Sequence, residues 1–139
     1  VGGPPCQGFS LKGKNLGLDD SRNFLFKEYL NIVKELQPEV FIIENVKNIL
    51  NSSSHYFRDE ILKEIKNLGY IVNYGVVNAK NYGVPQNRER AIFIASKTKF
   101  INFPNPQDKS VTVRDAISDL AYLESGQGQV ISEYKSVTK

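Results

Sequence analysis

Apolar residues recur along the chain with two spacings, and each spacing predicts one type of element. Over residues 24–36 they return every three or four positions, which predicts an amphipathic helix, and residues 57–68 repeat the same pattern. The residue before a proline avoids helical geometry, and glycine readily ends a helix, so each helix has a visible stop. The predicted caps are Asp20 or Ser21 and then Ser53 or Ser54, and the predicted stops are Gln37-Pro38 and Gly69.

The strand pattern is different. Residues 39–43 (EVFII) form a short, almost fully apolar run that is expected to end at Glu44-Asn45, as in a strand covered on both faces. Residues 70–79 and 91–96 also read as strands. The segment 80–90 between them (KNYGVPQNRER) has no helical period, so we expect an antiparallel hairpin with a long, functional loop. The predicted class is α/β, with a mostly parallel sheet that ends in one antiparallel strand.

The last part of the chain has a weaker pattern. Thr112-x-x-Asp115 resembles a capping box, with aspartate in the third place, and predicts a helix to about Leu123. The final fifteen residues or so, rich in Gly, Ser and Gln, are expected to form a loop or connection.

Composition narrows the class of protein. The 139 residues are 40% hydrophobic and 24% charged, which is ordinary for a globular domain, and the net charge of +3 permits a nucleic-acid partner. A single cysteine forms no internal disulfide, which favours the cytoplasm, and no apolar run is long enough to span a membrane. One histidine and one cysteine are too few ligands for zinc, so no metal is expected. The chain begins at Val1, directly at a motif, and is expected to be part of a longer protein.

Three chemically distinctive stretches fall where strands are predicted to end. Cys6 sits among glycines and prolines after a strand expected to begin before the first residue, Glu44 closes a strand, and Arg88 and Arg90 lie in the hairpin loop. Functional groups gather at the carboxyl ends of strands in open α/β sheets, so these side chains are expected to share one cleft. Each also has a plain structural reading, as a buried thiol or as solvated charges. His55, among serines, is expected at the surface.

Taken together, the motifs resemble the C5-cytosine DNA methyltransferase family over roughly residues 1–120. The resemblance rests on GPPCQ at 3–7, ENV at 44–46 and QNRER at 86–90, in that order, and on DSR at 20–22 followed by LF at 25–26 and TVRDAI at 112–117.

The resemblance implies a catalytic role for four residues. Cys6 would be the nucleophile that adds to C6 of cytosine, because a thiolate is both strongly nucleophilic and a competent leaving group. Glu44 would hold N3 and the exocyclic amine, and Arg88 and Arg90 would bind the base carbonyl O2 or neighbouring phosphates.

The methyl donor implied is S-adenosylmethionine, with Pro5 and Leu25 in contact with it. The implied fold is the Rossmann-like fold of S-adenosylmethionine-dependent methyltransferases, present only in part, since the family's glycine-rich donor loop and target-recognition region are not in the sequence. Residues 1–110 would form the C-terminal half of the catalytic domain, and 111–139 would lead toward target recognition. The isolated segment is expected to be inactive.

The implied partner is double-stranded DNA with a flipped cytosine, because C6 is unreachable inside the duplex. Residues 11–20 would close over the base, although they also read as a plain surface loop. A prokaryotic restriction-modification methylase is expected, with a cognate endonuclease that is not a stable subunit. The residues expected to contact DNA are Gln7, Ser10, Lys12, Lys14 and Arg22.

Three other functions stay open at this point. An RNA cytosine methyltransferase would use the same motifs, and a non-catalytic nucleic-acid-binding relative would share the fold, although an intact Cys6 and Glu44 favour an enzyme. A cysteine hydrolase is disfavoured because His55 is the only imidazole and has no setting suited to a catalytic base.

Overall fold

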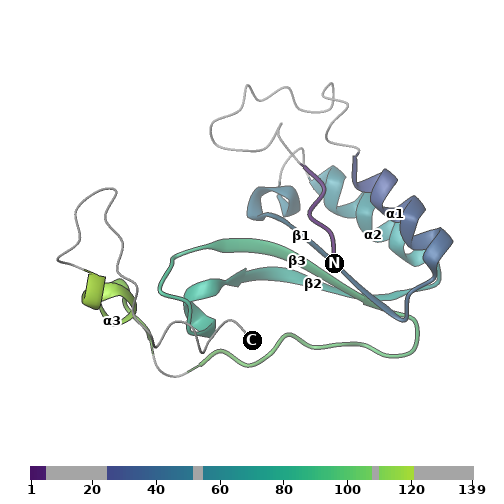
Figure 1. Cartoon of the computed structure of the whole chain (residues 1–139). Helices are drawn as coiled ribbons and strands as arrows, with labels where there is room; N and C mark the ends of the chain where they lie inside the picture. Colours follow the sequence, from purple (N-terminus) through teal and green to yellow (C-terminus); the bar gives the residue numbers. More distant parts are fainter. Residues whose placement is uncertain (6–24, 52–54, 108–109, 121–139) are drawn as a thin grey trace.

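The computed structural model describes residues 1–5, 25–51, 55–107 and 110–120. Figure 1 shows helices above a sheet and a third, short helix set apart from them. The helices are α1 (Leu25–Leu36), α2 (Tyr56–Asn67) and α3 (Val113–Ile117), and the strands are β1 (Val40–Val46), β2 (Ile71–Asn78) and β3 (Glu89–Ser96). Short 3₁₀ turns occupy Lys47–Leu50, Ala79–Tyr82 and Ser118–Leu120.

The three strands form one sheet in the order β1-β3-β2, and β3 is antiparallel to both neighbours. The α/β class and the antiparallel pairing of β2 with β3 are therefore confirmed. The expectation that the antiparallel strand ends a mostly parallel sheet is wrong for the described strands, because β3 inserts between the other two. Parallel pairing there is limited to an isolated bridge between Gly2 and Ile43. Strand β1 also continues through Glu44 and Asn45 to Val46, since β3 pairs with its whole length.

The helices α1 and α2 cover one face of the sheet (Figure 1). Alternate residues of β1 and β3 point into this layer, so Phe41, Ile43, Phe93 and Ala95 are buried. The apolar positions that predicted the helices meet them there, with Phe26, Leu30 and Val33 from α1 and Phe57, Ile61 and Ile65 from α2. Burial of these two helix stripes against one sheet face forms the core.

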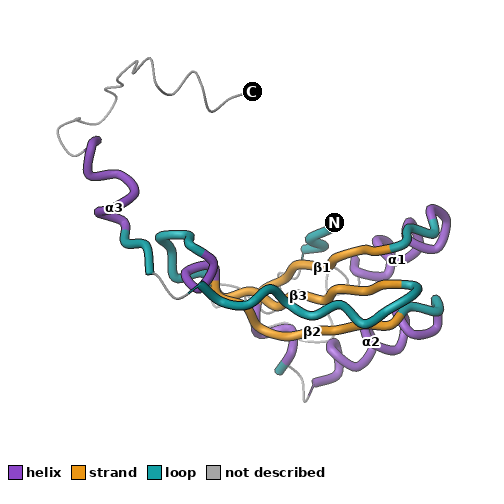
Figure 2. The backbone as a smooth tube through the Cα atoms, turned by 90° about the horizontal axis from the view of Figure 1, so that it is seen from below, coloured by secondary structure: helices purple, strands orange, loops and turns teal. Residues whose placement is uncertain are grey.

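The segment 97–107 crosses the opposite face of the sheet after β3 (Figure 2). Asn73 of β2 donates a hydrogen bond from its side chain to the Ile101 carbonyl at 2.9 Å. The Phe103 ring lies over Gly75, where a Cβ atom would come within 3.2 Å of the ring. This segment therefore packs across the sheet before the chain reaches α3.

The helix ends follow the sequence in part. Gly69 has a φ of 84°, the left-handed conformation expected after α2, and Gln37 ends α1 at a φ of 47°. The cap position of α2 is His55, whose side chain makes no capping hydrogen bond, and not the predicted serines. Thr112 and Asp115 form the predicted capping box, with α3 ending at Ile117. The candidate caps at positions 20, 21, 53 and 54, and the predicted helix end at 123, lie outside the described residues.

Candidate functional site

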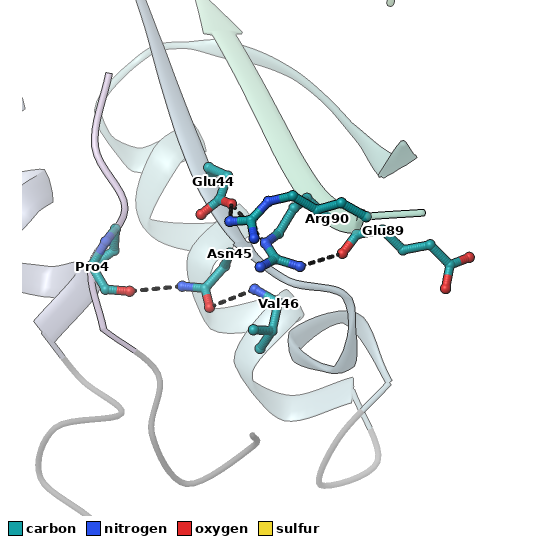
Figure 3. Close-up of polar contacts among 7 residues, drawn as sticks. Pro4, Glu44, Asn45, Val46, Glu89 and Arg90 are labelled. Atoms are coloured by element: carbon teal, nitrogen blue, oxygen red, sulfur yellow. Dashed lines mark hydrogen bonds and ion pairs between the residues drawn. The ribbon is translucent and has the colours of Figure 1, made fainter. Parts of the chain in front are cut away.

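Glu44 and the two arginines of the hairpin come together at one end of the sheet. In β1, Ile43 and Asn45 flank Glu44 and point into the helix-covered layer. The Glu44 carboxylate therefore lies on the opposite face of the sheet. Its Oε1 is 2.8 Å from Nε of Arg90 and 3.5 Å from Nη2 of Arg88 (Figure 3). The pairing of Val46 with Arg90 explains this contact, because it makes Glu44 and Arg90 diagonal neighbours on one face.

The cluster is open enough to meet a ligand. The side chains of Glu44 and Arg88 are 37% and 47% exposed, and that of Arg90 is 26% exposed. Arg90 also donates from Nη1 to the Glu89 carbonyl at 2.8 Å, which fixes the orientation of its guanidinium. A carboxylate held by one oriented guanidinium and approached by a second can present both acceptors and donors to a polar molecule.

The loop between β2 and β3 is tied at its base, which positions Arg88. The Asn78 Oδ1 atom accepts hydrogen bonds from the backbone N–H groups of Lys80 and Arg88, each at 3.2 Å. The Ala79 N–H donates to the Arg88 carbonyl at 2.9 Å. These hydrogen bonds close the base of the loop and hold the backbone of Arg88 in place.

An exposed ion pair joins two residues that adjoin the cluster along β1 and β3. Lys47 follows β1 and binds the Glu89 carboxylate at 2.5 Å. The hydrogen bond from Lys47 lowers the pKa of Glu89. Both side chains are largely exposed, so this pair contributes more to the charge pattern near Arg88 and Arg90 than to stability.

The N-terminal segment lies beside β1 next to Glu44. Gly2 donates to the Ile42 carbonyl and accepts from the Glu44 N–H, both at 2.9 Å, as in a parallel ladder. The Tyr29 ring covers this contact so closely that a Cβ atom on Gly2 would lie 2.2 Å from it, so a side chain there forces the ring to move. The Tyr29 hydroxyl donates to Ile42 O at 3.2 Å, and burial raises the pKa of that tyrosine.

Asn45 joins the same segment to β1 and was not among the predicted site residues. Asn45 is only 6% exposed, and its Nδ2 donates to the Pro4 carbonyl at 2.9 Å. Its Oδ1 accepts from the Val46 N–H at 2.9 Å (Figure 3). The sequence does indicate this role. Asn45 is the next alternate position of β1 after Phe41 and Ile43, which point into the core, and an amide buried there needs hydrogen-bond partners.

The remaining predicted residues divide into two groups. Pro5 is exposed and Leu25 is half-buried, and these two residues flank the range 6–24. His55 is exposed as expected, with its imidazole Nδ1 2.8 Å from the Leu50 carbonyl. Outside the described residues lie Cys6, Gln7, Ser10, Lys12, Lys14 and Arg22. The structure thus brings together Glu44, Arg88 and Arg90 of the four predicted catalytic residues. Within the described ranges, no helix has the length and apolar character needed to cross a membrane.

Comparison with known proteins gives one consistent result. The chain is 42% identical over 141 residues to the type II methyltransferase M1.HphI of Haemophilus parahaemolyticus, covering 99% of this chain and 38% of that protein. It is 44% identical over 124 residues to M.MthTI of Methanothermobacter thermautotrophicus, covering 86% and 37%. The chain therefore spans somewhat over a third of the length of these relatives.

Solved structures agree in fold. A proposed DNA modification methyltransferase encoded within an Escherichia coli prophage matches with a TM-score of 0.63 at 32% identity, over 93% of this chain and 34% of that one. Spodoptera frugiperda DNMT2, in a mutant form, matches with a TM-score of 0.51 at 28% identity, over 79% and 33%. The model of the family described as C-5 cytosine-specific DNA methylase matches residues 1–138. This chain belongs to the C-5 cytosine-specific DNA methylase family.

Proposed function

We propose that the protein carrying this chain transfers a methyl group from S-adenosylmethionine to C5 of cytosine in DNA, as a methylase of a restriction-modification system. One observation carries the proposal most directly. The Glu44 carboxylate meets Arg90 and Arg88 on one side, and on the other side Gly3 lies so near that a Cβ there would be 3.5 Å from Oε2. Gly3 is three residues before Cys6, so the covalent chain tethers the proposed nucleophile to this carboxylate.

The proposed chemistry begins with Cys6. Its thiolate adds to C6 of cytosine, forming a C–S bond, and the displaced electron density moves to N3, where the Glu44 carboxyl group holds it by a hydrogen bond. When bound, S-adenosylmethionine supplies an electrophilic methyl group. That methyl group would go to C5, and the donor's sulfur would keep the bonding pair. Water then removes the C5 proton, the electron pair restores the C5–C6 double bond, and the thiolate leaves.

Arg90 and Arg88 have separate proposed tasks. Arg90 is oriented by Glu44 and by the Glu89 carbonyl, which suits a fixed contact to the base carbonyl O2. Arg88 is more exposed and farther from Glu44, which suits a neighbouring phosphate. Glu44, paired with both arginines through Oε1, is proposed to select cytosine by accepting from its exocyclic amine.

Pro5 and Leu25 are the described residues proposed to touch the methyl donor. Both leave apolar surface accessible, at either end of the range 6–24, so they fit apolar contact with the donor rather than recognition of its charged groups. Strand directions support a Rossmann-like fold: β1, β2 and the segment at Gly2 run one way, and β3 runs the other. Residues 1–110 are proposed to belong to the catalytic domain.

The proposed partner is double-stranded DNA with the target cytosine flipped out, bound in the cytoplasm without a membrane. The net charge of +3 agrees with a polyanionic partner. Gln7, Ser10, Lys12, Lys14 and Arg22 are proposed to contact DNA. A cognate restriction endonuclease would recognise the same DNA as a separate protein.

Covalent trapping tests the proposed function. The full-length protein is mixed with S-adenosylmethionine and with duplex DNA in which every cytosine is replaced by 5-fluorocytosine, since fluorine at C5 blocks the last proton removal. We expect a stable protein–DNA adduct, resolved by denaturing electrophoresis, that Cys6→Ser abolishes. An adduct that persists in Cys6→Ser would place the nucleophile elsewhere. Trapping by the matching RNA in place of the DNA would instead indicate an RNA methyltransferase.

A further inference from the structure

The N-terminal segment pairs with β1 at Gly2 and departs from that pairing at Pro4. Gly2 N–H bonds to Ile42 O, and Glu44 N–H bonds to Gly2 O, so this pair follows the register of a parallel ladder centred on Ile43. One step further, that register requires an N–H of residue 4 to reach Glu44 O and the Val46 N–H to reach Pro4 O. Proline has no N–H, so the first bond cannot form.

The second bond is replaced by the Asn45 side chain. The Val46 N–H donates to Asn45 Oδ1, and Asn45 Nδ2 donates to Pro4 O, both at 2.9 Å. The amide thus satisfies the donor and the acceptor that an ordinary ladder would have joined directly. It also holds Pro4 farther from β1 by the width of one amide group.

The buried position of this amide shows that the arrangement is specific. Asn45 is 6% exposed and lies in the same alternate row as Phe41 and Ile43, which are apolar and buried. A polar side chain in such a row is tolerated only when its hydrogen bonds are satisfied, and here both ends of the amide are bonded to backbone groups.

We propose that Asn45 is a positioning residue: its amide spaces Pro4 from β1 and thereby sets where Cys6, two residues later, meets the Glu44 site. The proposal rests on the proposed function for its catalytic consequence. Asn45 acts through Pro4 and touches no substrate. The spacing itself is a property of the backbone and can be tested without substrate.

Asn45→Ala is the main test in the full-length protein. Removal of the amide leaves the Val46 N–H and the Pro4 carbonyl free to bond to each other, so the segment is expected to move onto β1 while the fold survives. We expect kcat for methyl transfer, and the rate of adduct formation with 5-fluorocytosine DNA, to fall at least about twentyfold, because small misplacements of a reacting group are costly. KM for DNA should change less than about threefold.

Asn73→Ala is the matched control. Asn73 is also a strand asparagine whose Nδ2 donates to a backbone carbonyl at 2.9 Å, that of Ile101, away from the N-terminal segment. Its kcat should stay within about twofold of the parent. Asn45→Asp keeps the acceptor for Val46 but, when ionised, has no donor for Pro4, and it takes the place of Asn45→Ala if that variant does not fold.

Two further measurements separate the possible failures. Titration of active sites by the trapped adduct distinguishes a slower site from a smaller folded fraction. The alkylation rate of Cys6 by iodoacetamide, followed on its own peptide by mass spectrometry, reports its surroundings without any methyl transfer. If the parent forms no adduct and transfers no methyl group, the proposed function fails, and the alkylation rate alone decides whether Asn45 positions Cys6. A folded Asn45→Ala protein with unchanged alkylation and a rate constant per active site within twofold of the parent would overturn the inference.

Discussion

Two ends of the same β1–β3 ladder have opposite character. At one end, Phe41 and Ile43 pair with Ala95 and Phe93, and all four side chains are buried beneath the helices. At the other end, Val46 pairs with Arg90, and the adjoining side chains of Glu44, Arg88 and Arg90 form a half-exposed cluster of charges. The backbone pairing is continuous from one end to the other.

The difference separates stability from chemistry within a few residues. Burial of large apolar side chains contributes most of the folding free energy, whereas ion pairs with partly exposed partners contribute little, because water and salt screen them. The charges at the Glu44 end are therefore poorly explained by stability. The proposed function accounts for them instead, since its substrate needs donors and acceptors held at the end of a rigid strand.

The largest expected effect lies at the buried end. Phe93 is fully buried and its ring stacks on Tyr74 with centroids 5.7 Å apart. Phe93→Ala should lower the free energy of unfolding by about 3–5 kcal/mol, measured by denaturant titration, because it leaves a cavity. Phe100→Ala, at a residue 55% exposed, is the control and should cost under about 0.5 kcal/mol. A loss below about 1.5 kcal/mol for Phe93→Ala would break the comparison.

A smaller effect in free energy, but a decisive one for chemistry, is expected at the other end. Glu44→Gln keeps the shape of the side chain but weakens its charge complementarity at N3, so kcat for methyl transfer should fall about 10²-fold. The free energy of unfolding should change by less than about 1 kcal/mol. Glu39→Gln, at the exposed residue just before β1, should alter neither quantity. Methyl transfer by Glu44→Gln within about twofold of the parent would make Glu44 structural.

The smallest expected effect is the difference in kcat between lysine substitutions at the two arginines. Arg90 is 2.8 Å from Glu44 and the less exposed, whereas Arg88 is 3.5 Å away. A lysine lacks the planar fork, so Arg90→Lys should lower kcat about tenfold and Arg88→Lys about threefold, measured by steady-state methyl transfer. Equal losses, or a larger loss for Arg88→Lys, would contradict the separate tasks proposed for them.

The sequence predicted most elements and the three clustered charges, for physical reasons that are local. The helical spacing of apolar residues over 25–36 and 56–67 reflects one buried face on each helix. The absence of such spacing over 80–90 correctly indicated the hairpin. The order of strands was not predictable in this way. Whether β3 lies outside β2 or between β1 and β2 depends on pairing between residues far apart in the chain, which leaves no trace in the pattern of either strand.

Asn45 shows what closer reading of a pattern can recover. It is polar at a position where the alternation predicts burial, and it lies opposite Pro4, which cannot donate to a ladder. The predicted strand end at Glu44-Asn45 placed the amide outside the buried row, where it would need no buried partners. Accounting for the hydrogen-bond partner of each backbone and side-chain amide group identifies Asn45 from the sequence.

The central place of β3 also bears on how the protein is made. Arg88 follows Glu44 by 44 positions, and β3 is the last of the three strands to leave the ribosome. Until then β1 and β2 have no shared partner, and their unpaired edges are open to association with other nascent chains. Long-range closure of this kind is slow compared with formation of the flanking helices. A chain released before β3 is complete would carry Glu44 without either guanidinium, so assembly of the charged site is coupled to the end of sheet formation.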